Sequence, residues 1–340
     1  MTSYRDGWML GHSKSSASPQ DVVGGHYDVV VMTASWDSRC TCLTDADVTA
    51  TVGIGIFFES RGSGALRDAH DPIVSQYLES RSAEFVRLTR ASEDTDGLWH
   101  ELWARVQRAA QACGRPIRVL LDLSTCPRIY AMALIGNGFR SQLVAEMTVF
   151  YAEGAYPARP VDEPHEVFTA GRWQTVPVPG LEGDSQPSKP RRYVVSVGFE
   201  GSKTMRAVSS EGADFVSVLF PRPGVREDYE ERTWDDNQEL LEEFGVSGDD
   251  VLDAAAGDAI TAWRRLAEAA GRWSADDLFY LPCGPKPHAV GMALHSLTSG
   301  TASVMYAKPA SHKEAETTAL GKYWAYELRD VTSVPVARTT

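Results

Sequence analysis

Short apolar runs alternate with longer amphipathic segments along most of the chain. Before residue 157 the apolar runs are Val29–Met32, Ile54–Phe58, Val119–Leu121 and Val149–Tyr151. Each run is too short for a helix and is rich in β-branched or aromatic residues, which is typical of buried strands. Between the second and third runs, apolar side chains recur at helical spacing, as in Leu98, Leu102 and Val106. Strands that alternate with helices need crossover connections, so the pattern predicts an α/β fold with a mostly parallel, Rossmann-like sheet.

A proline-rich stretch interrupts this alternation and marks a domain boundary. Beyond it the apolar runs are Tyr193–Val197, Phe215–Phe220, Leu278–Leu281 and Ser303–Tyr306. Within the stretch, Glu166–Phe168 and Trp173–Val178 could pair as a small hairpin. The predicted organisation is a flexible leader over 1–27, a first Rossmann-like lobe over 28–157, a linker over 158–192, a second lobe over 193–330 and a tail over 331–340.

Four segments of the first lobe match four segments of the second lobe, in the same order along the chain. Asp28-VVVMTASWDSRCTCL lies opposite Tyr193-VVSVGFEGSKTMRAV, and Val119-LLDLSTCPRIYAMAL lies opposite Leu278-FYLPCGPKPHAVGMAL. Two shorter pairs fall in the same order, at an offset of roughly 155 to 165 residues that suits a domain duplication better than a solenoid. We therefore predict two tandem Rossmann-like halves with mostly parallel sheets, related by internal duplication. A chance likeness between two Rossmann-like units is the alternative.

Composition and charge narrow the classes of partner. The 340 residues are 43% hydrophobic and 23% charged, which suits a soluble globular protein. A formal net charge of −13 disfavours duplex nucleic acid and anionic membranes as partners, so an anionic ligand would need a local basic pocket. Because no apolar run is long enough to span a bilayer and residues 1–27 lack a secretion signal, we expect a cytoplasmic protein.

Known cofactor and metal motifs do not occur in the sequence. The five cysteines form no CxxC pair, which argues against a structural zinc site or a disulfide framework. The sequence has neither a GxGxxG after a strand nor a GxxxxGK[ST], so the usual phosphate-cradling turns are missing. We expect no cofactor and no metal.

Hydroxyl and cationic residues follow the first and third strand of each predicted half. These candidate ligand-binding residues are Ser38, Arg39, Ser124, Thr125 and Arg128 in the first half, and Ser202, Lys203, Lys286 and His288 in the second. Loops at the carboxyl edge of a parallel sheet are where ligands bind, and the following helices offer free N–H groups. The set therefore predicts phosphate or nucleotide binding. The alternative for each residue is a helix cap or a solvated surface charge.

Four residues in these loops are candidates for catalysis. Cys126 and Cys283 fall at equivalent turns, where a helix N-terminus could lower a thiol pKa. Asp122 could orient a sugar hydroxyl or act as a base, or it could fix the turn by accepting backbone N–H bonds. His288 could be a general acid or a phosphate donor, or a polar residue that opens a helix. The cysteines could equally be small buried residues.

The segment Val119-LLDLSTCPRIYAMAL joins a strand, an aspartate, a hydroxyl-rich turn, a basic residue and a helix of small residues. It resembles the ligand motif of CARF domains, the Rossmann-like sensors of cyclic oligoadenylates in prokaryotic antiviral defence. Two such units in one chain resemble the SAVED domain, which is similar to a pair of CARF-like halves. The glycine pair usual in the CARF turn is replaced here by Thr125-Cys126-Pro127.

This resemblance implies a sensor that binds a cyclic oligonucleotide or another phosphorylated ligand between two pseudo-symmetric lobes. The expected basic cleft is lined by Arg39, Arg128, Lys203 and Lys286. The signal would pass to a separate effector protein or to self-association, without duplex nucleic acid or membrane as a partner. One alternative is an enzyme that acts on a nucleotide or phosphorylated substrate, for example by cleaving the messenger. A second is a scaffold subunit of a defence complex, which would have no concave basic cleft.

Overall fold

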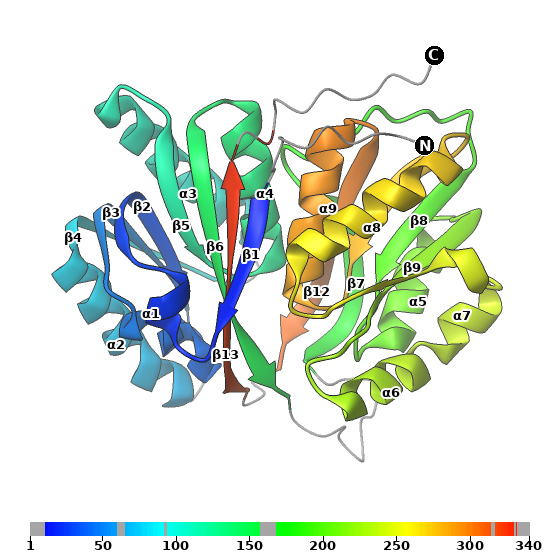
Figure 1. The fold of residues 1–340 in the computed structure, drawn as a ribbon, viewed down its shortest axis with the longest axis horizontal. Helices are drawn as coiled ribbons and strands as arrows, with labels where there is room; N and C mark the ends of the chain where they lie inside the picture. Colours follow the sequence, from blue (N-terminus) through cyan, green and yellow to red (C-terminus); the bar gives the residue numbers. More distant parts are fainter. Residues whose placement is uncertain are drawn as a thin grey trace.

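Two twisted sheets lie side by side in the computed structural model, each with helices on both faces (Figure 1). The structure describes residues 11–59, 65–91, 94–156, 168–313, 317–329 and 331. Pairing is parallel among the central strands, and it is antiparallel where Gly11–Ser16 and Thr318–Arg329 join the first sheet and where Thr169–Pro177 joins the second. The predicted α/β fold with two Rossmann-like halves is confirmed.

The first sheet has seven strands within the described residues. Their spatial order is β1 (Gly11–Ser16), β13 (Thr318–Arg329), β6 (Val144–Ala155), β5 (Ile117–Asp122), β2 (Gly25–Thr33), β3 (Val48–Phe58) and β4 (Ser82–Arg90). Its helices are α1 (Pro19–Val22), a 3-10 helix (Ser38–Asp45), α2 (Ala65–Arg81), α3 (Thr95–Cys113) and α4 (Arg128–Arg140). The strands β2, β3, β5 and β6 contain the four apolar runs predicted for this half.

The second sheet has six strands within the described residues. Their order is β10 (Val251–Ala254), β9 (Phe215–Pro221), β8 (Arg191–Ser196), β11 (Asp277–Pro282), β12 (Ala302–His312) and β7 (Thr169–Pro177). Its helices are α5 (Gly201–Ser210), α6 (Glu227–Asp236), α7 (Gln238–Glu243), α8 (Ala259–Ala270) and α9 (Lys286–Ser299), with short 3-10 turns at Gly248–Asp250 and Gly271–Trp273.

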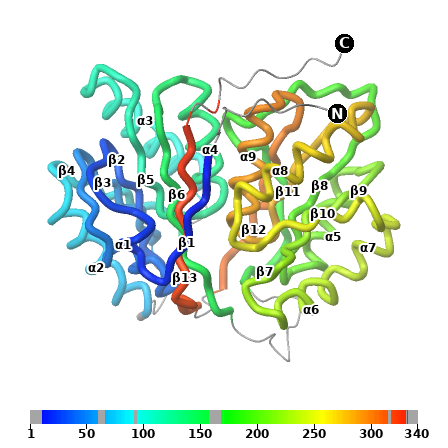
Figure 2. The backbone as a smooth tube through the Cα atoms, in the orientation of Figure 1, coloured from blue at the N-terminus to red at the C-terminus, as the bar shows by residue number. Residues whose placement is uncertain are grey.

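The two halves share one strand order, but the antiparallel strand beside β6 comes from the C-terminal end of the chain. The order β4-β3-β2-β5-β6-β13 in one sheet corresponds to β10-β9-β8-β11-β12-β7 in the other. In the chain, β7 follows β6, yet it pairs with β12; β13 follows β12, yet it pairs with β6. Figure 2 shows β13 in red beside β6 and the blue β1. The first sheet is therefore completed by β13 from the C-terminal half of the chain, whereas the second is completed by β7, which directly precedes β8.

The position of β13 and the pairing of β7 change the predicted boundaries. Residues 193–330 were expected to form the second lobe, whereas Thr318–Arg329 joins the first sheet. The segment Trp173–Val178 was expected to pair with Glu166–Phe168; it lies in and just after β7, which pairs with β12, and Glu166 is outside the described residues. The edge of a sheet can pair with a segment from anywhere in the chain. Assigning β7 and β13 to their neighbours in sequence therefore gave the wrong pairing for both strands.

The leader and the tail also differ from expectation. Within the predicted leader 1–27, Gly11–Ser16 forms β1, Pro19–Val22 forms α1, and β2 begins at Gly25. The first ten residues lie outside the described part of the chain. Of the predicted tail 331–340, the structure describes Val331, whose side chain is buried in the core.

The helices α4 and α9 join the two lobes. They pack against each other, and ten of the 13 residues of α4 and ten of the 14 residues of α9 are buried. A helix that is apolar on every side belongs in the interior, and these two share one hydrophobic cluster with side chains of both sheets. The turns before them match closely: Pro127 has φ −56° and ψ 135°, and Pro285 has φ −56° and ψ 141°. The lobes therefore form a single packed body.

Candidate functional site

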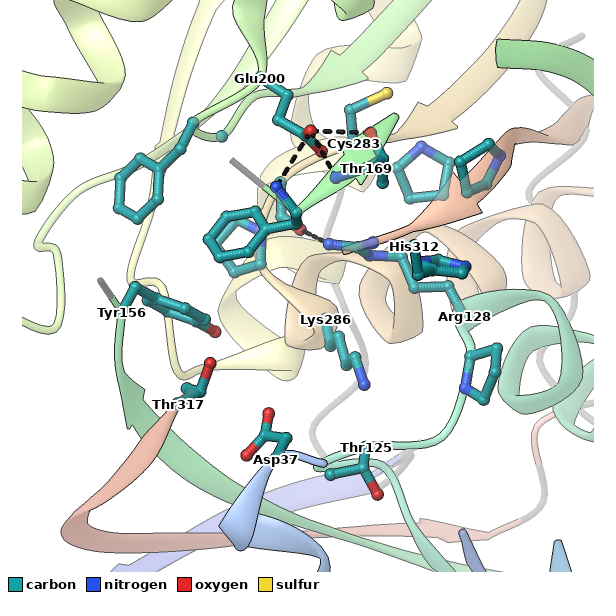
Figure 3. Close-up of a pocket in the computed structure, with 18 of the residues that line it drawn as sticks. Asp37, Thr125, Arg128, Tyr156, Thr169, Glu200, Cys283, Lys286, His312 and Thr317 are labelled. Atoms are coloured by element: carbon teal, nitrogen blue, oxygen red, sulfur yellow. Dashed lines mark hydrogen bonds between the residues drawn. The ribbon is translucent and has the colours of Figure 1, made fainter. Parts of the chain in front are cut away.

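A cavity of about 760 Å³ lies where the carboxyl ends of the strands of both sheets meet. Its first wall comes from the segments after β2, β3 and β5 and from the end of β6. Its second wall comes from the segments after β8, β9 and β11 and from the end of β12. Figure 3 shows Asp37 and Thr125 of the first half facing Glu200, Thr169 and Cys283 of the second across this space. This is the edge at which the sequence placed a ligand.

Arg128 and Lys286 both line the cavity wall (Figure 3). Each is the first residue of its helix, and each donates to the turn in front of the other helix. Lys286 Nζ donates to the carbonyl oxygens of Leu123 at 3.1 Å, Ser124 at 2.9 Å and Cys126 at 2.9 Å. Arg128 Nη2 donates to the carbonyl oxygen of Gly284. The predicted pair of cations is therefore shared between the halves.

Burial and neighbouring cations weaken the positive charge of Lys286. The side chain is surrounded by protein, and Arg39 and Arg128 are close by. These factors lower the pKa of Lys286 to about 7. In the part of the chain that the structure describes, neither Arg128 nor Lys286 forms an ion pair with a carboxylate. Added negative charge at this point would be stabilised by both side chains.

The two cations that follow the first strand of each half are neutralised by their own loops. Arg39 is buried, and its Nη2 lies 2.6 Å from Asp37 Oδ2, with Nε 3.0 Å from Asp37 Oδ1. Lys203 is buried as well, with Nζ 3.3 Å from Glu200 Oε1 and 2.8 Å from Thr169 Oγ1. Arg39 lines the cavity and Lys203 does not. Both were predicted as ligand cations, and both act first as partners of an internal carboxylate.

The hydroxyl residues of the predicted set mostly stabilise the backbone. Ser124 Oγ accepts from the backbone N–H of Ala152 at 3.0 Å, and Thr125 Oγ1 donates to the carbonyl oxygen of Thr33 at 2.6 Å. Ser38 Oγ donates to the carbonyl oxygen of Thr317 at 3.1 Å. Of the predicted hydroxyl residues, Thr125 lines the cavity, while Ser38, Ser124 and Ser202 do not.

Asp122 fixes the turn after β5 and does not reach the cavity. Its side chain is fully buried, Oδ1 accepts from the Ser124 N–H at 2.9 Å, and Oδ2 has no hydrogen-bond partner. Burial raises the pKa of Asp122 to about 6, against the effect of the bond from Ser124. Of the two roles open to Asp122 in the sequence, the geometry matches the turn-fixing one.

His288 is a buried structural residue. Its Nδ1 lies 3.2 Å from Ser196 Oγ, and its Nε2 lies 3.2 Å from the carbonyl oxygens of Ala254 and Ala255. Burial lowers the pKa of His288 to about 4, so the ring is neutral at physiological pH. Because its helical position turns it toward β8 and β10, it does not line the cavity, contrary to the predicted ligand contact.

Neither cysteine has the lowered pKa expected at a helix N-terminus. Burial raises the pKa of Cys126 to about 11 and that of Cys283 to about 12. Cys283 lines the cavity and Cys126 lies beneath it. Desolvation of the thiolate exceeds the favourable effect of Lys286 on one thiol and Arg128 on the other. Both thiols therefore stay protonated at neutral pH.

Several lining residues were not predicted from the sequence. Ten aromatic side chains line the cavity: Trp36, Phe58, Tyr130, Tyr151, Tyr156, Phe168, Trp173, Phe199, Tyr229 and Tyr306. Among the described residues, six Lys or Arg and four Asp or Glu side chains accompany them, so cationic side chains outnumber anionic ones in this part of the wall of a strongly negative chain. These residues come from many separate loops and strand ends, so no local motif marks them. Trp36 lies in the loop after the first strand, which is one of the segments matched between the two halves. That position is the feature of the sequence that could have marked it as a lining residue.

A search of the described residues for metal sites and membrane-spanning helices adds no functional assignment. Across the described ranges, no group of three or more His, Cys, Asp or Glu side chains could hold a metal ion. Among the same residues, no helix is both long and apolar enough to cross a membrane.

Comparison with known proteins yields weak structural similarity and no family. No protein-family model matches the chain, and no curated protein matches it. Among solved structures, the cytoplasmic domain of a prokaryotic cation chloride cotransporter is similar with a TM-score of 0.24 and 10% sequence identity. The match covers 84% of this chain and 96% of that chain. A TM-score of this size supports no assignment of function.

Proposed function

We propose that this protein binds a phosphorylated, nucleotide-type ligand, such as a cyclic oligonucleotide, in the cavity between its two halves. The observation that carries the proposal is the position of Arg128 and Lys286. Both lie in the wall, both hydrogen-bond to backbone carbonyls, and neither is neutralised by a carboxylate among the described residues. In a chain of net charge −13, this is a local site for an anion.

The aromatic lining supports a nucleotide over a simple anion. Bases stack on aromatic side chains, and arginine adds cation–π contacts. Arg39 Cζ lies 5.3 Å from the centre of the Tyr156 ring, and Tyr156 is in the cavity wall (Figure 3). A volume of about 760 Å³ falls in the range of small-molecule sites. Phosphate and base would therefore both find suitable groups.

Binding is favoured over the catalytic alternative by the state of the candidate nucleophiles. A thiol whose pKa is raised to about 12, as for Cys283, is a poor nucleophile at neutral pH. His288 faces away from the cavity and cannot serve Cys283 as a base. A scaffold subunit would have no concave basic site, so the cavity with Arg128 and Lys286 disfavours that alternative. The resemblance to sensors of antiviral defence extends the proposal to a signal passed to an effector or to self-association.

A thermal-shift panel tests the proposal. Purified protein is mixed with mononucleotides, linear dinucleotides, cyclic di- and trinucleotides, and inorganic tripolyphosphate. A ligand that binds the native state at 100 times its Kd stabilises it by about 2.7 kcal/mol. We expect a selective rise in Tm with one class of cyclic oligonucleotide, and recovery of that ligand unchanged. Conversion to a product would favour the enzyme, and no shift with any probe would reject the proposal.

A matched pair of variants ties binding to the proposed residues. Lys286→Gln keeps a hydrogen-bond donor but removes the charge, and we expect it to weaken ligand binding at least about tenfold. Lys189 also donates to a backbone carbonyl, that of Ser274 at 2.9 Å, but lies outside the cavity wall. Lys189→Gln should leave affinity unchanged. Equal affinity of the two variants by calorimetry would place the anion elsewhere.

A further inference from the structure

The cavity contains a second group of side chains that the proposed phosphate site does not use. We name it the Trp36 subsite: Trp36, Phe58, Glu59, Arg67 and His312. These residues come from the loop after β2, the end of β3, α2 and the end of β12. They therefore bring both halves of the chain to one side of the cavity.

Trp36 is held as a flat surface at the cavity wall. Arg67 Cζ lies 5.1 Å from the centre of its ring, and the His312 ring centre lies 6.4 Å away at an interplanar angle of 44°. Arg67 Nη1 is within hydrogen-bond distance of the carbonyl oxygens of Phe58 (3.3 Å) and Glu59 (3.4 Å), which anchors the guanidinium over the indole. Trp36 itself is half-buried, so part of its surface remains available to a ligand.

His312 links this surface to the phosphate site. The ring lines the cavity wall, and Figure 3 shows it beside Arg128. Burial, together with the positive charges of Arg128, Lys286 and Arg67, lowers the pKa of His312 to about 4. A neutral imidazole can stack on a planar group and can donate or accept one hydrogen bond.

Glu59 adds a chemical preference to the subsite. Its carboxylate is exposed and forms no hydrogen bond or ion pair with any residue that the structure describes. An ionised carboxylate only accepts hydrogen bonds, so it favours a ring edge that presents N–H groups and disfavours one that presents carbonyl oxygens. It also repels phosphate, which directs the anionic part of the ligand toward Arg128 and Lys286.

We propose that the Trp36 subsite binds a nucleobase with an exocyclic amino group, stacked on Trp36 and hydrogen-bonded through that amino group to Glu59. This inference rests on the proposed function and specifies the ligand class further. It makes Glu59 the specificity-determining residue, and it makes the two ends of the cavity chemically different. The ligand is then bound in one orientation, with a base against the first half and a phosphate between the helices.

Ligands that differ only at the amino position test this inference. We would measure the affinities of cyclic di- and trinucleotides of adenine against those of hypoxanthine, and of cytosine against those of uracil. The amino member of each pair should bind at least about tenfold tighter, because a hydrogen bond to a charged acceptor discriminates by that much. Glu59→Gln should reduce this preference to threefold or less, since an amide can also donate.

Two further variants distinguish the effect of base stacking on binding from the effects of a changed surface charge or of misfolding. Trp36→Leu should weaken binding of the base-bearing ligands about tenfold but leave tripolyphosphate binding unchanged. Glu84, an exposed residue of β4 outside the cavity, provides the matched control, and Glu84→Gln should bind like the wild type.

The outcomes separate this inference from the proposed function. If amino and oxo ligands bind the wild type equally, or Trp36→Leu binds as tightly, the base subsite is wrong while the phosphate site stands. If no probe binds the wild type, the proposed function fails and this inference with it.

Discussion

Arg128 and Lys286 occupy equivalent positions in the two halves, and each donates to the backbone turn before the other's helix. The relationship resembles that of identical residues across a two-fold axis, although one side chain is arginine and the other lysine. It joins the lobes at the floor of the cavity. An anion bound there would therefore contact the two side chains that hold the halves together. Ligand binding could then change how the two lobes are arranged.

The depressed pKa of Lys286 makes stability depend on pH. The folded pKa of about 7 lies below the ordinary value of 10.5, so the unfolded chain binds more protons between these limits. The contribution of Lys286 to stability should therefore rise from pH 7 toward pH 10.5, by at most about 1.4 kcal/mol per pH unit. We would compare urea unfolding of the wild type and Lys286→Met at pH 7 and pH 9.5. Parallel pH dependences in the two proteins would contradict the prediction.

Asp122 has the opposite linkage. Its pKa is raised to about 6 from an ordinary value of 3.8, so the stability associated with protonated Asp122 is present below pH 4 and is lost as the pH rises through 6. Asp122→Asn removes the buried charge and keeps an acceptor for the Ser124 N–H. We expect it to stabilise the protein at pH 7.5 by about 3 kcal/mol, and to have little effect at pH 4. Asp68→Asn, at an exposed position, is the control and should change neither value. A loss of stability at pH 7.5 would show that Asp122 is needed as a carboxylate.

The ion pair of Asp37 and Arg39 should be strongly coupled. Both side chains are buried, and Asp37→Asn would leave the Arg39 guanidinium without its carboxylate. The expected loss is about 3 to 5 kcal/mol. Asp37→Asn combined with Arg39→Met should recover much of it, because the unpaired buried charge is then gone. A double-mutant cycle by chemical denaturation measures this coupling, and additive losses would exclude it.

The position of β13 in the first sheet should make the two halves of the chain interdependent. A fragment that ends at residue 167 lacks β13, the antiparallel partner of β6, and a fragment that begins at residue 168 carries β13 without its sheet. Each fragment alone should lack a cooperative unfolding transition. Mixed after co-refolding, they should form a 1:1 complex with the far-ultraviolet circular dichroism of the intact chain. Two independently folded fragments that do not associate on size-exclusion chromatography would rule this out.

Local sequence predicted the elements that local physics controls. The runs Val29–Met32, Val119–Leu121 and Tyr193–Val197 lie in or end just beyond β2, β5 and β8, because short β-branched runs are stable only as buried strands. The prolines at 127 and 285 stand directly before α4 and α9, because a fixed φ suits a helix start. Arg128 and Lys286 both line the cavity, since the edge of a parallel sheet collects its loops; their role as ligand-binding residues stays a prediction.

The sequence by itself therefore determined the strand–helix alternation, the matched halves and the edge at which the loops converge, because these depend on spacing and on residue type along a few turns. The tertiary structure alone decided which sheet β7 and β13 complete, which cations are neutralised, and which aromatic side chains share one wall. Those outcomes depend on contacts between segments more than 100 residues apart, such as Tyr326 with Val149 and Lys286 with Ser124. Their geometry is set by the packing of α4 against α9, and no local pattern encodes it.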